Sequence, residues 1–161
     1  RGYAHKHKVL SLVDRQTRQA HSMVVDDLKA ATLVPILQEN IGSESRVMTD
    51  EVGQYKHLNR HFADHSAVRH NAGEYVSRDD PTVHTNTIEG YFSIFKRGMK
   101  GVYQHCAKEH LHRYLAEYDL RYNHRIALGV DDTERAEKAL RGIVGKRLTY
   151  RTTNQQVSTH G

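Results

Sequence analysis

Two short runs of β-branched and aliphatic residues near the start of the chain constrain its fold most. Residues 9–13 and 23–25 flank a polar stretch at 14–19, and this arrangement predicts a β-hairpin over residues 8–25. Farther along, apolar residues recur at intervals of three and four, which is the period of a helix rather than of a strand. A hairpin followed by helices predicts an α/β fold in which helices cover a mixed sheet.

The remaining elements continue this pattern. We predict a helix over residues 28–41, with Pro35 in its first turn or at a kink, and a strand over 46–49 that ends at Asp50. A short helix over 55–62 and a strand over 67–70 follow. Helices are predicted over 85–99 and 108–123, and Asp131 can cap a last helix. We expect one domain over residues 1–150 and a polar tail over 151–161.

The composition fits a soluble protein with an acidic partner. Hydrophobic residues make up 37% of the 161 residues, and no apolar run approaches the roughly 18 residues that span a membrane. The single cysteine, Cys106, cannot form an internal disulfide, which favours the reducing cytoplasm. The net charge of +5 favours nucleic acid as a partner, although many domains that bind no nucleic acid are equally basic.

Asp50 is the first candidate site residue. An acidic side chain at the carboxyl end of a buried strand points into the crevice where α/β folds bind their ligands. An aspartate at such a place often only caps the turn that follows. Taken alone, the capping role is the simpler interpretation of Asp50.

The predicted helix over residues 85–99 carries a polar stripe beside an apolar one. A sector of roughly 80° holds the polar side chains of Asn86, Glu89, Ser93, Lys96 and Lys100. The adjacent apolar stripe would anchor the helix on a core and comprises Ile88, Phe92, Phe95 and Met99. A carboxylate that faces a second carboxylate can hold a divalent ion, and a nearby cation can contact a phosphate. An ordinary solvated helix face would show the same pattern.

Phosphoryl transfer is the chemistry that would use both Asp50 and the polar stripe of the predicted helix. Cutting and joining DNA requires an activated water or 3′-hydroxyl and stabilisation of the charge on the attacked phosphate. Two Mg²⁺ ions about 3.5–4 Å apart supply both, and acidic oxygen ligands hold them. Such sites usually gather three acidic or amide side chains from two strands and a helix. This sequence offers one strand acid and one helix site.

Four blocks of the sequence together resemble one protein family. They are VMTD at 47–50, VHTNTIEGYFSIFKR at 83–97, GVY at 101–103 and YLAEYDLRYN at 114–123. In this order they resemble the ISXO-like insertion-sequence transposases (the fifteen-ninety-five group), over about residues 2–150. The resemblance implies an RNase H-like DDE core that performs metal-dependent DNA cleavage and strand transfer. It also implies Mg²⁺ or Mn²⁺ as cofactor, transposon-end and target DNA as partners, and a homo-oligomer.

The resemblance further implies roles for individual residues. Asp50 would be the second acid of the triad, and Asn86 or Glu89 would be the third metal-site residue, because the family varies at that position. A carboxylate is the stronger ligand for a hard dication, which favours Glu89, whereas the family pattern favours Asn86 at least equally. The side chains expected to steer the DNA backbone are Lys96, Arg97 and Lys100.

One family feature has no counterpart in this sequence. In the family, the first catalytic Asp lies on a strand before the hairpin, and residues 1–8 resemble only the end of the stretch that follows it. The aspartates at 14, 26 and 27 do not occupy the matching position, and the family's N-terminal zinc ribbon is also missing. We therefore expect the first strand to be missing and this polypeptide alone to be inactive. The alternative to an active transposase is a catalytically dead, DNA-binding remnant.

Overall fold

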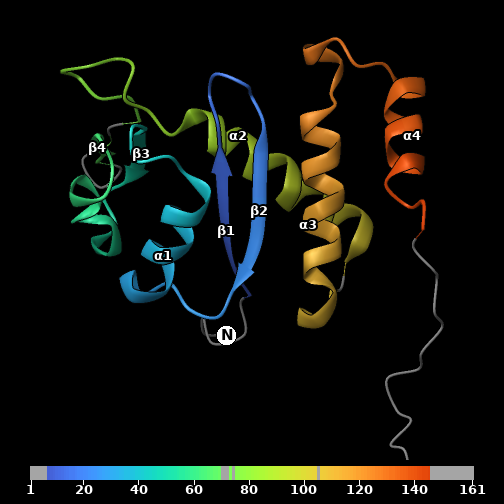
Figure 1. The fold of residues 1–161 in the computed structure, drawn as a ribbon, viewed down its shortest axis with the longest axis horizontal. Helices are drawn as coiled ribbons and strands as arrows, with labels where there is room; N and C mark the ends of the chain where they lie inside the picture. The colour runs from blue at the N-terminus through green and yellow to red at the C-terminus, as the bar shows by residue number, and fades with distance from the viewer. Residues whose placement is uncertain (1–6, 70–72, 74, 105, 146–161) are drawn as a thin grey trace, which may run out of the picture. The chain divides into compact units, whose positions relative to one another are not determined.

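The strands and helices of the chain follow the order that the sequence predicts (Figure 1). The computed structural model describes residues 7–69, 73, 75–104 and 106–145, so the predicted tail at 151–161 lies outside the described residues. The chain divides into two compact units, residues 1–123 and 124–161, where the sequence predicts one domain to residue 150.

The predicted hairpin opens the first unit. Strands β1 (Lys8–Val13) and β2 (Ala20–Val25) pair antiparallel, with Ser11 opposite Ser22. Asp14 holds the turn between them, because its carboxylate accepts hydrogen bonds at 2.7 Å from both the Gln16 N–H and the Thr17 hydroxyl. These two bonds fix the polar stretch that the sequence assigns to the turn.

A second, parallel sheet follows the helix α1 (Ala30–Asn40). It consists of β3 (Arg46–Asp50) and β4 (Asp64–Val68). Pro35 lies inside α1, beyond its first turn. The single helix predicted over 55–62 is instead a pair of short 3₁₀ turns, Gly53–Tyr55 and Leu58–Arg60. The strand predicted over 67–70 begins earlier, because β4 pairs with the whole length of β3.

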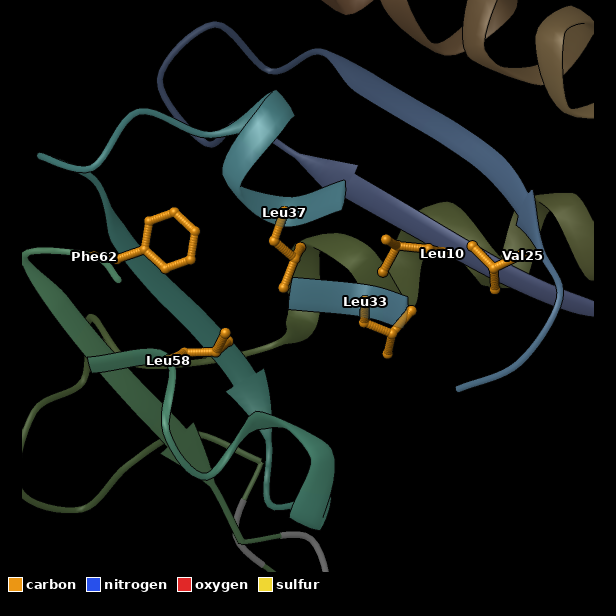
Figure 2. Packing of buried hydrophobic residues seen from close by; sticks show 6 residues of the cluster. All are labelled: Leu10, Val25, Leu33, Leu37, Leu58 and Phe62. Atoms are coloured by element: carbon orange, nitrogen blue, oxygen red, sulfur yellow. The ribbon is translucent and has the colours of Figure 1, made fainter. Parts of the chain in front are cut away.

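Two leucines of α1 join the hairpin to the second half of this unit. Leu33 and Leu37 pack in one buried cluster with Leu10 and Val25 of the hairpin (Figure 2). The same cluster contains Leu58 and Phe62, which lie between β3 and β4. Full burial of a leucine side chain stabilises a fold by about 1.5–3 kcal/mol. Apolar burial across α1 is therefore what holds the hairpin beside the second sheet.

The other face of the hairpin is covered by α2 (Asn86–Gly98) and α3 (Lys108–Asn123), which a π-helical turn, Met99–Tyr103, separates. Val9 and Val24 pack there against a second cluster, whose buried members are Phe95, Leu111 and Leu115. Successive side chains of a strand point to opposite faces. The hairpin is therefore covered on both faces, by α1 on one and by α2 and α3 on the other.

Side chains of α3 also close the outer edge of β2. The Asn123 amide accepts a hydrogen bond from the Ala20 N–H at 2.6 Å and donates one to the Ala20 carbonyl at 2.8 Å. Asp119 accepts from the Ser22 N–H at 2.6 Å. An exposed strand edge presents unpaired backbone groups that can recruit another strand. Here α3 supplies the partners that a neighbouring strand would supply.

The outer edge of β1 is different. Since Ala20 and Ser22 direct their backbone groups toward α3, the alternation of an antiparallel ladder directs those of Val9, Ser11 and Val13 away from β2. Within the part of the chain that the structure describes, each sheet has only two strands, and none pairs with this edge. The predicted single mixed sheet is thus two small sheets, one antiparallel and one parallel.

The second unit contains α4 (Asp132–Arg141), which follows a 3₁₀ turn at Ile126–Leu128. The predicted cap is confirmed, because the Asp131 side chain accepts a hydrogen bond from the Glu134 N–H at 2.8 Å. Gly129 adopts the left-handed backbone (φ 80°) that favours glycine. Among the described residues, no helix is long and apolar enough to cross a membrane.

Gly98, the last residue of α2, permits the close approach of α2 to α3. A Cβ at this position would overlap the Tyr118 hydroxyl and lie 2.5 Å from the ring carbon Cζ. We predict that Gly98→Ala lowers the free energy of unfolding by about 1–3 kcal/mol, because the Tyr118 ring must move. Gly90→Ala is the matched control in the same helix, because a Cβ there meets nothing within 4 Å. It should raise the free energy of unfolding by about 0.5–1 kcal/mol. Urea unfolding of the two variants measures both changes, and equal stabilities would contradict the close approach.

Candidate active site

Asp50 is the last residue of β3 and is half-buried. It stands opposite Val68, the last residue of β4, so it lies at the carboxyl end of both parallel strands. This is the edge of a parallel sheet at which α/β folds bind ligands. Burial, and then the nearby Asp50 carboxylate, raise the pKa of Tyr55. Tyr55 therefore lies in the electrostatic environment of Asp50, a neighbour that the sequence did not single out.

Thr49 and His65 fix the backbone at the end of β3. The Thr49 hydroxyl donates to the Asp50 carbonyl at 2.8 Å and lies 2.9 Å from Nε2 of His65. Because a hydroxyl carries one proton, it accepts from Nε2–H of His65 when it donates to the carbonyl. Burial lowers the pKa of His65, which favours the neutral ring. The backbone of Asp50 is thus held from both strands of the parallel sheet.

Asn86 and Glu89 lie in the first turn of α2, and both are exposed. Thr85, the residue that precedes the helix, donates its hydroxyl to Oε1 of Glu89 at 2.6 Å. The Glu89 N–H donates in turn to the Thr85 carbonyl at 3.0 Å. Thr85 is only 7% exposed, so its hydroxyl is a fixed point from which the Glu89 carboxylate is oriented. Sequence analysis missed Thr85, although a hydroxyl residue four positions before a first-turn acid could have indicated it.

Basic side chains follow at the other end of α2. Lys96 and Arg97 lie in its last turn, Lys100 lies in the π-helical turn, and all three are exposed. The Lys96 ammonium lies 5.7 Å from the centroid of the Phe92 ring, which favours one position of this long side chain. An acid in the first turn and bases in the last turn also complement the helix dipole. These charges therefore have a structural role even without a ligand.

The predicted polar stripe of α2 is exposed throughout, as the sequence indicates. Its predicted apolar stripe is confirmed at Phe95, which is buried, and at Phe92 and Met99, which pack against the same cluster. The most deeply buried side chain of the helix is one that the sequence did not place there. Tyr91, with 2% exposure, points into the unit between the hairpin and α3.

Arg46 links the parallel sheet to the loop that precedes α2. Its guanidinium donates to Asp64 at 2.8 Å, to Asp80 at 2.7 Å and to the Thr82 hydroxyl at 2.8 Å. Asp64 is its cross-strand neighbour on β4, whereas the other two belong to the loop. One side chain therefore connects the start of β3, the start of β4 and the approach to α2.

Arg15 fastens the same loop to the hairpin. From the turn between β1 and β2, its guanidinium contacts the Thr82 carbonyl at 2.6 Å, the Met48 sulfur at 2.7 Å and Nε2 of His84 at 2.9 Å. Nδ1 of His84 is buried without a hydrogen-bond partner among the described residues. The two arginines together set where α2 begins, and so where Asn86 and Glu89 stand.

The candidate metal ligands have suitable chemistry and are few. Asp50, Glu89 and Asn86 offer carboxylate and amide oxygens, which are the ligands that Mg²⁺ prefers. In the part of the chain that is described, no group of three or more His, Cys, Asp or Glu side chains could hold a metal ion. The donor types thus fit a hard dication, whereas these residues alone do not complete a site of three acidic ligands.

Comparison with known proteins identifies the family. The profile of the ISXO2-like transposase domain matches residues 1–123. The chain belongs to this family. The match ends at the last residue of the first compact unit, so that unit is the transposase domain. The resemblance inferred from the sequence blocks is confirmed, and it associates the chain with transposition.

A curated relative agrees with this assignment. An uncharacterized transposase-like protein of Haemophilus influenzae is 26% identical in an alignment of 113 residues that covers 65% of this chain and 81% of that protein. No solved structure matches the chain.

Asp80 gives the loop a testable pH dependence. The Thr82 hydroxyl and then Arg46 lower the pKa of Asp80 from its ordinary 3.8 to about 2. A carboxyl group whose pKa is lower in the folded state stabilises the fold above its unfolded pKa, and this contribution is lost as the pH falls through the folded value.

We predict that wild type is more stable than Asp80→Asn above about pH 5, and that the difference shrinks between about pH 4 and pH 2. Urea unfolding across this range measures it. Asp79→Asn removes a charge one residue away, and the same pH profile for both variants would contradict the assignment.

Proposed function

We propose that the first unit belongs to the catalytic core of a DDE transposase, which cleaves DNA at the ends of an insertion sequence and joins those ends to target DNA. The observation that carries the proposal is the pair of acids within the transposase domain. Asp50 stands at the carboxyl end of two parallel strands, and Glu89 stands at the start of α2 with its carboxylate oriented by Thr85.

Asp50 and Glu89 would hold Mg²⁺ or Mn²⁺, with Asn86 as the alternative to Glu89. A bound dication supplies charge neutralisation at the attacked phosphate and a lower pKa for the attacking water or 3′-hydroxyl. The chain's own residues have positioning tasks. Thr85 orients the Glu89 carboxylate, and Thr49 and His65 fix the backbone at Asp50.

An RNase H-like arrangement is the finer fold that we propose. It is supported by the outer edge of β1, with which no strand of the described residues pairs, and by the position of α1, whose leucines bridge the hairpin and the second half of the unit. A strand between β1 and β3 would pair with both and merge the two small sheets into one mixed sheet. Such a strand is also where the first catalytic Asp of the family would lie.

DNA is the proposed partner, at the transposon ends and at the target. Its phosphates would lie along the basic end of α2, where Lys96, Arg97 and Lys100 are exposed. We propose a homo-oligomer, because two ends must be joined to one target, and the cytoplasm as the place of action.

Metal binding tests the acids directly. We predict that Asp50→Asn and Glu89→Gln each weaken the binding of Mn²⁺ at least about tenfold, because each removes a charged oxygen ligand. Electron paramagnetic resonance of free Mn²⁺ during titration of the protein measures the dissociation constant. Asn86→Ala, measured beside Glu89→Gln, identifies which of the two residues of α2 is the ligand.

Two variants control for the loss of charge alone. Asp26 directly follows β2 and is exposed, so Asp26→Asn matches Asp50→Asn. Glu109 lies in the first turn of α3, so Glu109→Gln matches Glu89→Gln. An unchanged Mn²⁺ affinity in Asp50→Asn, or an equal loss in its control, would reject Asp50 as a ligand.

The salt dependence of DNA binding tests the basic end of α2. Each phosphate contact contributes about −0.9 to the slope of log K against log salt for duplex DNA. We predict that Lys96→Ala makes the slope less negative by about 0.9, and that Lys29→Ala, which removes an exposed lysine at the start of α1, leaves it unchanged. Fluorescence anisotropy with a labelled duplex between about 50 and 200 mM salt measures both. Equal slopes for wild type and Lys96→Ala would place the DNA elsewhere.

A catalytically dead, DNA-binding remnant is the second candidate function. It is favoured by the small number of acids available as metal ligands among the described residues. The remnant binds DNA with the same salt dependence, but Mn²⁺ binding does not depend on Asp50 or Glu89. The two experiments above therefore separate the two functions.

A further inference from the structure

A buried polar network connects α2 to the hairpin and to α3. The Tyr91 hydroxyl donates to Oδ1 of Asp119 at 2.7 Å. The Ser22 hydroxyl lies 3.0 Å from the same carboxylate oxygen and 2.8 Å from the Tyr91 oxygen, and the Ser22 N–H donates to Oδ2 at 2.6 Å. Ser11 completes the network, with its hydroxyl 2.8 Å from that of Ser22. Side chains from four elements thus form one network, in which the Asp119 carboxylate is contacted by Tyr91 and Ser22 and Ser11 is joined through Ser22.

This network is buried, which makes its geometry restrictive. Asp119 is 8% exposed and Tyr91 is 2% exposed. A buried carboxylate is tolerated only when hydrogen-bond donors surround it, and a donor that moves leaves it unsatisfied at a substantial cost. The Tyr91 hydroxyl is one of the donors to this buried carboxylate. Any rotation of α2 would withdraw that donor from Asp119.

The apolar contacts of α2 restrict its rotation less. The Tyr91 ring packs edge-on against Tyr122 of α3, with a centroid distance of 5.3 Å. Phe95 packs edge-on against Tyr118 in the same cluster. Such contacts tolerate small rotations because dispersion and apolar burial have little directionality, whereas a hydrogen bond weakens steeply when it is bent. The polar bond is therefore the stricter constraint on the helix.

The position of Tyr91 on α2 connects this constraint to the candidate site. Tyr91 follows Glu89 by two residues, which places the two side chains about 200° apart around the helix axis. Fixing Tyr91 on the inward face therefore fixes Glu89 on the outward face. Asn86, in the same turn as Glu89, is set by the same rotation.

We infer that the Tyr91–Asp119 hydrogen bond fixes the rotation of α2 and thereby aims Glu89 and Asn86 at the metal site. Tyr91 and Asp119 are then positioning residues that act through Glu89 and Asn86. This inference rests on the proposed function, because it assigns α2, which carries Glu89 and Asn86, a geometry required for metal binding.

Tyr91→Phe is the direct test, because it keeps the buried ring and removes only the donor. We expect amide hydrogen exchange within residues 86–98, followed by NMR, to become about tenfold faster, which corresponds to the loss of a hydrogen bond to a charged group. Exchange within α1, residues 30–40, should change by less than about twofold. Unchanged exchange in α2, or an equal change in α1, would overturn the inference.

Tyr118→Phe is the matched control. It removes the hydroxyl of a neighbouring tyrosine that packs on Phe95 and Gly98 of α2 but is not part of the network. Ser22→Ala is a second variant, because it removes a hydroxyl of the network and leaves the Tyr91–Asp119 bond in place. Both should leave α2 exchange within about twofold of wild type. An effect of Tyr118→Phe as large as that of Tyr91→Phe would show a packing role and overturn the inference.

Mn²⁺ binding separates positioning from stability. At a temperature where all variants are folded, Tyr91→Phe should weaken Mn²⁺ binding about tenfold, while Tyr118→Phe should not. If Glu89→Gln weakens binding and Tyr91→Phe does not, the aiming of Glu89 by this bond is rejected. If neither Glu89→Gln nor Asp50→Asn affects Mn²⁺, the proposed metal site fails, and the exchange experiment still decides whether Tyr91 fixes α2.

Discussion

The fold of the transposase domain depends on the satisfaction of polar groups that become buried when helices cover both faces of a short hairpin. With α1 on one face and α2 and α3 on the other, Ala20 of β2 and the inward serines of the strands, Ser11 and Ser22, are largely shielded from water. Asn123 and Asp119 supply the missing partners for Ala20 and Ser22. Since an unpaired buried group costs about 1–3 kcal/mol, these contacts specify one position of α3.

Apolar burial then arranges the remaining elements around the hairpin. Leu33 and Leu37 of α1 connect it to the segment between β3 and β4, while Phe95 and Leu115 connect α2 and α3 to its opposite face. The candidate site lies outside both clusters, at the end of β3 and the start of α2. Its two acids are therefore supported by rigid elements whose cores they do not interrupt, which suits groups that must bind a charged ligand.

The loop before α2 links the parallel sheet, where Asp50 lies, to the start of α2, where Asn86 and Glu89 lie. Arg15 from the hairpin and Arg46 from β3 both bind Thr82, so the loop is held from two sides. Exposed ion pairs contribute little to stability individually. Here their consequence is geometric, because they determine where the chain enters α2 and hence where Asn86 and Glu89 stand.

Local sequence patterns alone determined several secondary-structure elements of this protein. The β-rich runs of the hairpin, the helical period of residues 108–123 and the cap at Asp131 were all readable from the sequence, because each depends on neighbours within a few residues. The transposase blocks likewise identified the family and the candidate acids. Tertiary structure decided which side chains those patterns brought together. Tyr91 and Asp119 gave no local signal, since their hydrogen-bond partners lie on other elements. The separation into two small sheets was likewise beyond the sequence, because strand pairing joins distant segments whose hydrogen bonds no local period encodes.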